Sequence, residues 1–178
     1  MTLHVNPSSA LVLAAAITLG AGGCASGENQ AATHTDATST AALWDPCTQV
    51  TAPTLRQMGV DPDTKASTAK EQPGFKYCTW DSSKAVWAYT IGIRSTTYPL
   101  DAIKRTKTPS TDVSIGSHTG IQYRPADQSA NRACELVLSI PAAAIYVEAY
   151  ESPTAGGESD PCARALSAAR IVEPSLPN

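Results

Sequence analysis

The residues of this chain that could do chemistry, judged by their type and spacing, are its five cysteines. Cys24 stands apart near the N-terminus, and separations of 31, 56 and 28 residues divide the other four, Cys47, Cys78, Cys134 and Cys162. A structural zinc site is disfavoured, because its ligands come in closely spaced pairs and the sequence has no Cys-x-x-Cys or Cys/His cluster. The same missing spacing disfavours redox catalysis. In an oxidising compartment, the four cysteines therefore predict two disulfide bonds.

The N-terminal segment indicates such a compartment. Residues 10–21 form an uncharged run of apolar and small side chains. As a helix this run would measure about 18 Å, which is shorter than the roughly 30 Å hydrocarbon core of a bilayer. Its length is typical of the hydrophobic region of a signal peptide. Residues 1–23 are therefore predicted to direct export and to be removed.

The chemistry expected of Cys24 is lipidation. The sequence Ala21-Gly22-Gly23-Cys24 resembles the bacterial lipobox, whose cysteine thiol receives a diacylglycerol and becomes the mature N-terminus. The match is incomplete, because Ala21 stands where lipoboxes usually carry Leu and because residues 1–9 contain no Lys or Arg. Lipidation is the favoured interpretation. The alternative is an ordinary signal peptide that is cut near Gly23 and leaves Cys24 unmodified.

The residues after Cys24 divide into a tether and one domain. Residues 25–43 are rich in Ala, Ser and Thr and show no hydrophobic periodicity. Such a segment cannot bury enough apolar surface to offset the entropy lost on ordering. Residues 24–43 are therefore predicted to be the lipidated cysteine and a flexible tether that ends about 25 Å from the anchor on average. Residues 44–178 are predicted to form a single globular, disulfide-bonded domain.

The surroundings of the four domain cysteines differ in pairs. The tripeptide Asp-Pro-Cys occurs at residues 45–47 and again at residues 160–162. An Asp followed by Pro is typical of a helix start, because the carboxylate accepts from free backbone N–H groups and Pro suits the first helical position. Cys78 and Cys134 lie in strand-like contexts instead. Each disulfide is therefore expected to tie the start of a helix to a sheet.

Four cysteines allow three pairings, and the sequence alone does not choose among them. The path of the chain favours one. The strand that begins at Cys134 turns near Pro141 and returns to Tyr150, so that its return end lies beside Cys134 and close to Cys162. The preferred pairing is therefore Cys134 with Cys162, which leaves Cys47 with Cys78.

Hydrophobic periodicity predicts an α+β fold. We expect an antiparallel sheet of about five to six strands, three short helices covering one or both faces, and two disulfides. Trp87, Tyr89, Ile91 and Ile93 alternate along one strand, which predicts that Trp87 and Tyr89 pack in the core. The expected helices cover residues 51–59, 99–107 and 161–171, and the expected strands cover residues 74–81, 85–94, 112–115, 120–124, 134–140 and 143–150.

A search for catalytic groups finds little. His118 lies in a polar turn and is expected to be solvated rather than a general base. Asp61 and Asp63 lack the glycine and the distal Glu of a calcium loop. Glu148 and Glu151 fall near a strand end and are expected to be solvating charges. No hydrolase or metalloprotease motif is present, so we expect no catalysis and no metal.

Composition disfavours two further classes of protein. The chain has 13 Lys and Arg against 16 Asp and Glu, a net charge of -3, and no basic run, which argues against nucleic-acid binding. No glycine-rich loop opens a helix after a strand, so the phosphate site of a nucleotide cofactor is missing. No cofactor is expected.

Motifs along the whole mature chain resemble those of one protein family. Those of the first half are Cys24 with its tether, Trp44-Asp45-Pro46-Cys47 before a helix ending at Gly59, and Cys78-Thr79-Trp80. Those of the second half are Gly120, the Cys134 strand, Asp160-Pro161-Cys162 and Leu176-Pro177. The chain resembles actinobacterial exported lipoproteins that carry domain of unknown function 3558. The resemblance implies an exported location and disulfides, but no activity, because none is established for the family.

These observations together predict a cell-membrane lipoprotein on the extracytoplasmic side. Its expected function is that of a non-catalytic binding, sensing or interaction module, attached to the membrane through the lipid anchor. The expected partner is an envelope protein or a lipid, with Trp87, Tyr89, Tyr98 and Tyr123 as candidate anchors. The alternative is a carrier of a lipid or other hydrophobic ligand, held where the Ala-rich final helix meets the sheet.

Overall fold

The computed structural model describes residues 43–67, 73–83, 87–126, 131–153 and 160–178. The predicted signal peptide, Cys24 and most of the tether lie outside the described residues. Within the described part of the chain, every helix is too short or too polar to cross a membrane.

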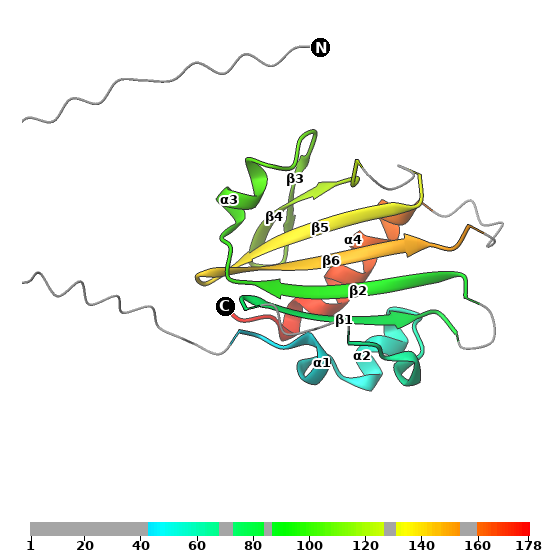
Figure 1. Ribbon diagram of the computed structural model, residues 1–178. Helices are drawn as coiled ribbons and strands as arrows, with labels where there is room; N and C mark the ends of the chain where they lie inside the picture. Colours follow the sequence, from blue (N-terminus) through cyan, green and yellow to red (C-terminus); the bar gives the residue numbers. More distant parts are fainter. Residues whose placement is uncertain (1–42, 68–72, 84–86, 127–130, 154–159) are drawn as a thin grey trace, which may run out of the picture. The chain divides into compact units, whose positions relative to one another are not determined.

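A six-stranded antiparallel sheet forms the centre of the domain, with the strand order β1-β2-β6-β5-β4-β3 (Figure 1). The predicted α+β class and strand number are therefore confirmed. Strand β2 lies between β1 and β6, although β6 begins about 50 residues later in the chain. The strands are β1 (Phe75–Asp81), β2 (Tyr89–Thr96), β3 (Thr111–Ile115), β4 (His118–Tyr123), β5 (Ala133–Ile140) and β6 (Ala143–Glu151).

The described part of the chain has four α-helices, one more than predicted, because the first Asp-Pro-Cys tripeptide starts a short helix of its own. Asp45, Thr51 and Asp160 each accept a hydrogen bond from a backbone N–H of the first helical turn, as N-cap residues do. The helices are α1 (Pro46–Gln49), α2 (Ala52–Gln57), α3 (Leu100–Lys104) and α4 (Pro161–Val172), with 3-10 turns at η1 (Pro62–Thr64) and η2 (Glu173–Ser175).

One face of the sheet is covered by α4, which lies behind the strands in Figure 1. Ala165, Ala168 and Ala169 are almost completely buried there. Their small side chains let the helix approach β5 and β6 closely, and the main core forms between them. Alternate residues of β5 and β6 face this core, among them Leu136 and Val147.

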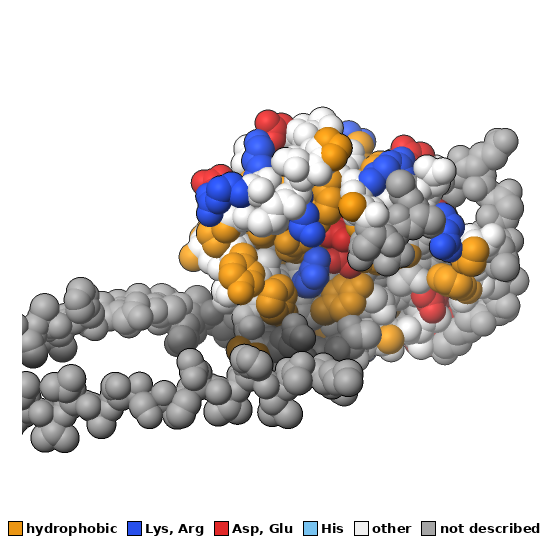
Figure 2. Space-filling model, turned by 45° about the horizontal axis from the view of Figure 1, so that its top comes forward, with side chains coloured by type: hydrophobic (Ala, Val, Ile, Leu, Met, Phe, Trp, Pro, Cys, Tyr) orange, Lys and Arg blue, Asp and Glu red, His pale blue; other side chains and the backbone are white. Residues whose placement is uncertain are grey.

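The opposite face of the sheet, called the α3 face below, is covered differently. Ile103 of α3 packs on Ile121, Val137 and Tyr146 and forms a second, smaller core over one corner. Most of the remaining side chains on this face alternate with those of the main core and carry polar groups, among them Tyr77, Arg94 and Glu148. In Figure 2, acidic and basic side chains lie beside one another among hydrophobic ones.

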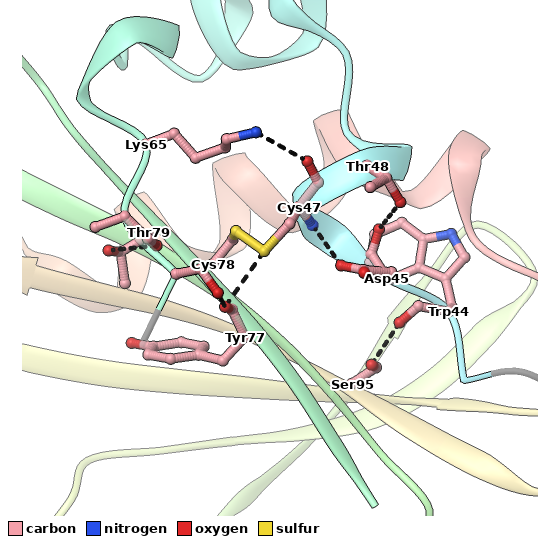
Figure 3. The surroundings of a disulfide bond; sticks show 11 residues. Trp44, Asp45, Cys47, Thr48, Lys65, Tyr77, Cys78, Thr79 and Ser95 are labelled. Carbon is pink, nitrogen blue, oxygen red and sulfur yellow. Dashed lines mark hydrogen bonds between the residues drawn. A yellow bond between two sulfur atoms is a disulfide. The ribbon is translucent and has the colours of Figure 1, made fainter. Parts of the chain in front are cut away.

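The two predicted disulfides are present. Cys47 is joined to Cys78 and Cys134 to Cys162, with Cα atoms 5.3 Å and 5.0 Å apart. This is the pairing that the path of the chain favours, and each bond joins the first turn of a helix to a strand. Around the first bond, Cys47 N–H donates to Asp45 (Figure 3).

The prediction for Trp87 was wrong. Trp87 precedes β2 and is 46% exposed, and its indole N–H donates to Thr90 Oγ1 at 2.8 Å. Strand β2 begins only at Tyr89, so the period-two pattern does not extend back to the tryptophan. Tyr89 does pack against the main core, and its hydroxyl donates to the carbonyl of Gly59 at 2.7 Å.

Candidate binding site

His118 is not the solvated turn residue that the sequence suggested. It is the first residue of β4 and is buried, because the chain after α4 folds back over it. Its Nδ1 lies 3.0 Å from Glu173 Oε1, and its Nε2 lies 3.0 Å from the carbonyl oxygen of Pro177. Hydrogen bonds from the Ser117 backbone and then from His118 lower the pKa of Glu173. The histidine therefore holds the C-terminal segment in place.

Glu148 was also predicted wrongly, as a solvating charge. It lies in the middle of β6 and is 2% exposed. Its Oε1 lies 2.8 Å from Arg94 Nη2, and its Oε2 accepts from the hydroxyls of Tyr77 and Tyr150, both at 3.0 Å. Glu151 at the end of the strand pairs with Arg164. The sheet pairing, which brings Arg94 of β2 beside β6, is what buries Glu148.

A second buried carboxylate stands next to Glu148. Glu135 of β5 is its direct partner in the β5–β6 register. Arg94 Nη2 lies 3.6 Å from Glu135 Oε2, and the same oxygen accepts from the hydroxyl of Tyr123. The Arg94 guanidinium lies over the ring of Tyr146 at 4.0 Å. We call this set the Glu–Arg–Tyr cluster; its members are Tyr77, Arg94, Tyr123, Glu135, Tyr146, Glu148 and Tyr150.

Gly92 makes room for the cluster. It is paired with Glu148 across the β2–β6 ladder. A Cβ at this position would lie 2.7 Å from the hydroxyl of Tyr77 and 3.1 Å from Glu148 Oε2. Any larger residue here would displace the tyrosine hydroxyl from the carboxylate, as expected where a strand glycine marks close approach.

The charges of the cluster do not cancel, because one guanidinium faces two carboxylates. Burial raises the pKa of Glu148, and Glu135 raises it further, against the lowering effect of Arg94. Burial lowers the pKa of Arg94, but Glu148 and Glu135 raise it by more, so that it stays protonated. Burial raises the tyrosine pKa values too, so the hydroxyls remain donors.

A Glu148→Gln variant is expected to differ from wild type in its pH dependence. The folded-state pKa of Glu148 lies above its ordinary value of 4.5, so the unfolded chain loses this proton first as the pH rises. Wild type therefore loses stability as the pH rises from 4.5 towards the folded pKa, and the variant lacks this loss. Urea unfolding between pH 4.5 and 8 should show a gap that widens in favour of the variant. Parallel curves would contradict the raised pKa.

A pocket of about 310 Å³ opens at one border of the cluster. The segment between α3 and β3, the end of β4, and Glu135 line it. Lys107 holds its ammonium over the Tyr123 ring, 5.1 Å from the centroid. No group of three or more potential metal ligands gathers among the described residues. The arrangement can therefore offer a ligand a carboxylate, an aromatic face and a displaceable ammonium.

Comparison with known proteins supplies a family and no activity. A family model described as "Protein of unknown function (DUF3558)" matches residues 19–175, which is most of the chain. The chain belongs to the DUF3558 family. It matches no curated protein and no solved structure. For this DUF3558 protein, the geometry of the domain is therefore the basis for any functional proposal.

The Glu–Arg–Tyr cluster of this DUF3558 protein was not predicted from its sequence. Its members come from five strands, and nothing in the sequence near Arg94 or Glu135 indicates that these side chains meet. One local signal was available. Gly92 stands between Ile91 and Ile93, inside the expected strand, and a glycine inside a strand often marks the close approach of another group.

Proposed function

We propose that this DUF3558 protein is a non-catalytic binding module of an actinobacterial exported lipoprotein, anchored in the cell membrane by a lipid on Cys24. The observation that carries the binding function is the Glu–Arg–Tyr cluster on the α3 face. The α4 face shows how this sheet builds a core mainly from apolar side chains. Burying a guanidinium and two carboxylates costs desolvation that ion pairing offsets only in part. Recognition of a partner is a reason to keep such groups.

The surroundings of the titratable groups support a function without catalysis. Glu148 has three donors on its carboxylate and is almost inaccessible. His118 is held between Glu173 and the carbonyl of Pro177. Neither side chain is available to exchange a proton with a substrate.

The carrier of a hydrophobic ligand receives no comparable support. Its expected place was the contact of the Ala-rich helix with the sheet. Ala165, Ala168 and Ala169 are buried there, directly against β5 and β6. The small side chains thus bring the layers together instead of lining a groove.

Photo-crosslinking from the α3 face tests the binding function. Tyr98 is 56% exposed and lies beside Phe75, with ring centroids 5.8 Å apart. Phe75 alternates with the core residues of β1 and so belongs to the α3 face. The full-length protein would carry benzoylphenylalanine at Tyr98 in its native envelope, with Arg170 on the exposed side of α4 as the control position. We expect an adduct from position 98 and none from position 170. Equal labelling from both positions, or none, would reject the proposed surface.

A Cys24→Ser variant tests the anchor. The wild-type protein is expected to enter the detergent phase on Triton X-114 partitioning, with a diacylglyceryl group on its N-terminal peptide. The variant should lack the lipid mass and remain an uncut precursor, because lipoprotein processing requires the modified cysteine. A wild-type protein found in the aqueous phase with an unmodified Cys24 would favour the ordinary signal peptide instead.

A further inference from the structure

The pocket beside the Glu–Arg–Tyr cluster has walls of unequal charge. Its volume of about 310 Å³ lies at the lower end of the range of ligand sites, roughly 300–1,000 Å³. Glu135 reaches it from β5, Tyr123 from the end of β4, and Lys107 from the segment after α3. The pocket is therefore sized for a small ligand or for one side chain of a larger partner.

Glu135 is the less neutralised of the two carboxylates. Arg94 Nη2 lies 2.8 Å from Glu148 but 3.6 Å from Glu135. Glu148 also accepts from two tyrosine hydroxyls, whereas Tyr123 is the one tyrosine among the described residues that donates to Glu135. The surplus negative charge of the cluster therefore lies at Glu135, which is the member that lines the pocket together with Tyr123.

Lys107 already places an ammonium against this wall. Its Nζ lies 5.1 Å from the centroid of the Tyr123 ring. Among the residues that the structure describes, Lys107 forms no salt bridge with a carboxylate. The ring of Tyr123 and the carboxylate bonded to its hydroxyl make the kind of surface that attracts an organic cation. Arg94 is held in the same way, between Tyr146 and the two glutamates. Lys107 thus stands in for a cationic ligand.

The remaining basic side chain of the pocket is compensated. Arg124 lines the pocket, but its guanidinium pairs with Asp160 at 2.6 Å. An anionic ligand would meet Lys107 and this paired arginine, and would have to approach the carboxylate of Glu135. A cationic ligand would meet the under-neutralised Glu135 and needs only to displace one flexible lysine.

We propose that this pocket binds an alkylammonium group, either of a small amine or of a lysine side chain of a partner, with Glu135 and the Tyr123 ring as its contacts and Lys107 as a built-in competitor. This rests on the binding function proposed above and names its ligand class.

The test compares a cation and an anion of the same size on the full-length protein in detergent. The probes are butylammonium chloride and sodium butyrate, titrated while the amide NMR signals of Tyr123 and Ala126 are followed. Glu135→Gln is expected to weaken butylammonium binding about tenfold or more, since it removes a charge-assisted contact. Lys107→Ala is expected to strengthen it about threefold or more by freeing the ring. Lys104→Ala, a lysine paired with Asp112 outside the pocket, should leave it unchanged.

Glu135→Gln and Lys107→Ala are expected to change the affinity for cations and the affinity for anions in opposite directions. If butyrate binds instead, is lost in Lys107→Ala and gains in Glu135→Gln, the pocket takes anions and the proposal is overturned. It is also overturned if neither probe shifts the signals. Tyr123→Phe keeps the ring and removes one donor from Glu135, so it should bind butylammonium at least as well as wild type even if Glu135→Gln fails to fold.

The lysine side chain of a partner is separated from a small amine by competition. If butylammonium suppresses the adduct formed from position 98, the ammonium site and the partner surface are the same. If the adduct forms but butylammonium does not bind, the binding module stands and the ammonium ligand is rejected.

Discussion

Replacing Arg94 by Met is expected to lower the free energy of unfolding at pH 7 by about 3–5 kcal/mol, because it leaves buried carboxylates without their cation. Glu148 depends on Arg94 most, at 2.8 Å and 2% exposure. Methionine keeps much of the packing volume over Tyr146. The loss of unfolding free energy therefore measures the removal of the positive charge more than the creation of a cavity. The measurement is urea unfolding followed by tryptophan fluorescence.

Three further measurements make the Arg94→Met result interpretable. The loss should shrink below about pH 4.5, the ordinary pKa of Glu148, where this carboxylate takes up a proton in both the folded and the unfolded state. A triple variant with Glu135→Gln and Glu148→Gln should regain most of the stability, since the cluster is then neutral. Arg170→Met on the exposed side of α4 should change stability by no more than about 0.5 kcal/mol. A loss of under about 1 kcal/mol for Arg94→Met would show that the cluster is not held by its ion pairs.

Replacing both Cys134 and Cys162 by Ala is expected to cost about 3.5 kcal/mol, the loop-closure entropy of a bridge across 28 residues. The consequence goes beyond entropy, because Cys162 fixes the first turn of α4, the helix that covers the main core. Amide exchange of Ala165 and Ala169 should therefore accelerate more in this variant than in a Cys47→Ala/Cys78→Ala control. The control removes a bridge of similar span, 31 residues, at the short helix α1. Equal exchange at α4 in the two variants would contradict a specific role for Cys162.

Much of the fold could be predicted from the sequence because it depends on interactions between residues that are close in the chain. Asp45 and Asp160 cap helices in the structure, as the Asp-Pro pairs predicted, since a cap needs only the next few backbone N–H groups. Strands β5 and β6 are buried along most of their length, and a short apolar run bounded by turn residues is enough to indicate such a strand. The antiparallel pairing of these consecutive strands follows from the short turn between them.

The failures fall where a residue's surroundings come from distant parts of the chain. His118 is buried only because residues 173–178 fold over it, and nothing near residue 118 encodes that contact. Trp87 looked like a core residue because the alternation continues through it, but the strand begins two residues later. Hydrophobic periodicity shows only how apolar residues are spaced in the chain. Whether such a residue is buried depends on which other segment packs against it.

The sequence by itself determined the class of the domain, its strand number and its two disulfide bonds, because capping, alternation and cysteine spacing act over short distances or by simple counting. Only the tertiary structure brought Arg94, Glu135 and Glu148 together. Strand β2 pairs with β6, and β6 with β5, so residues 94, 135 and 148 meet on one face. Such long-range pairing follows from the free energy of the whole sheet, which no local pattern in the chain expresses.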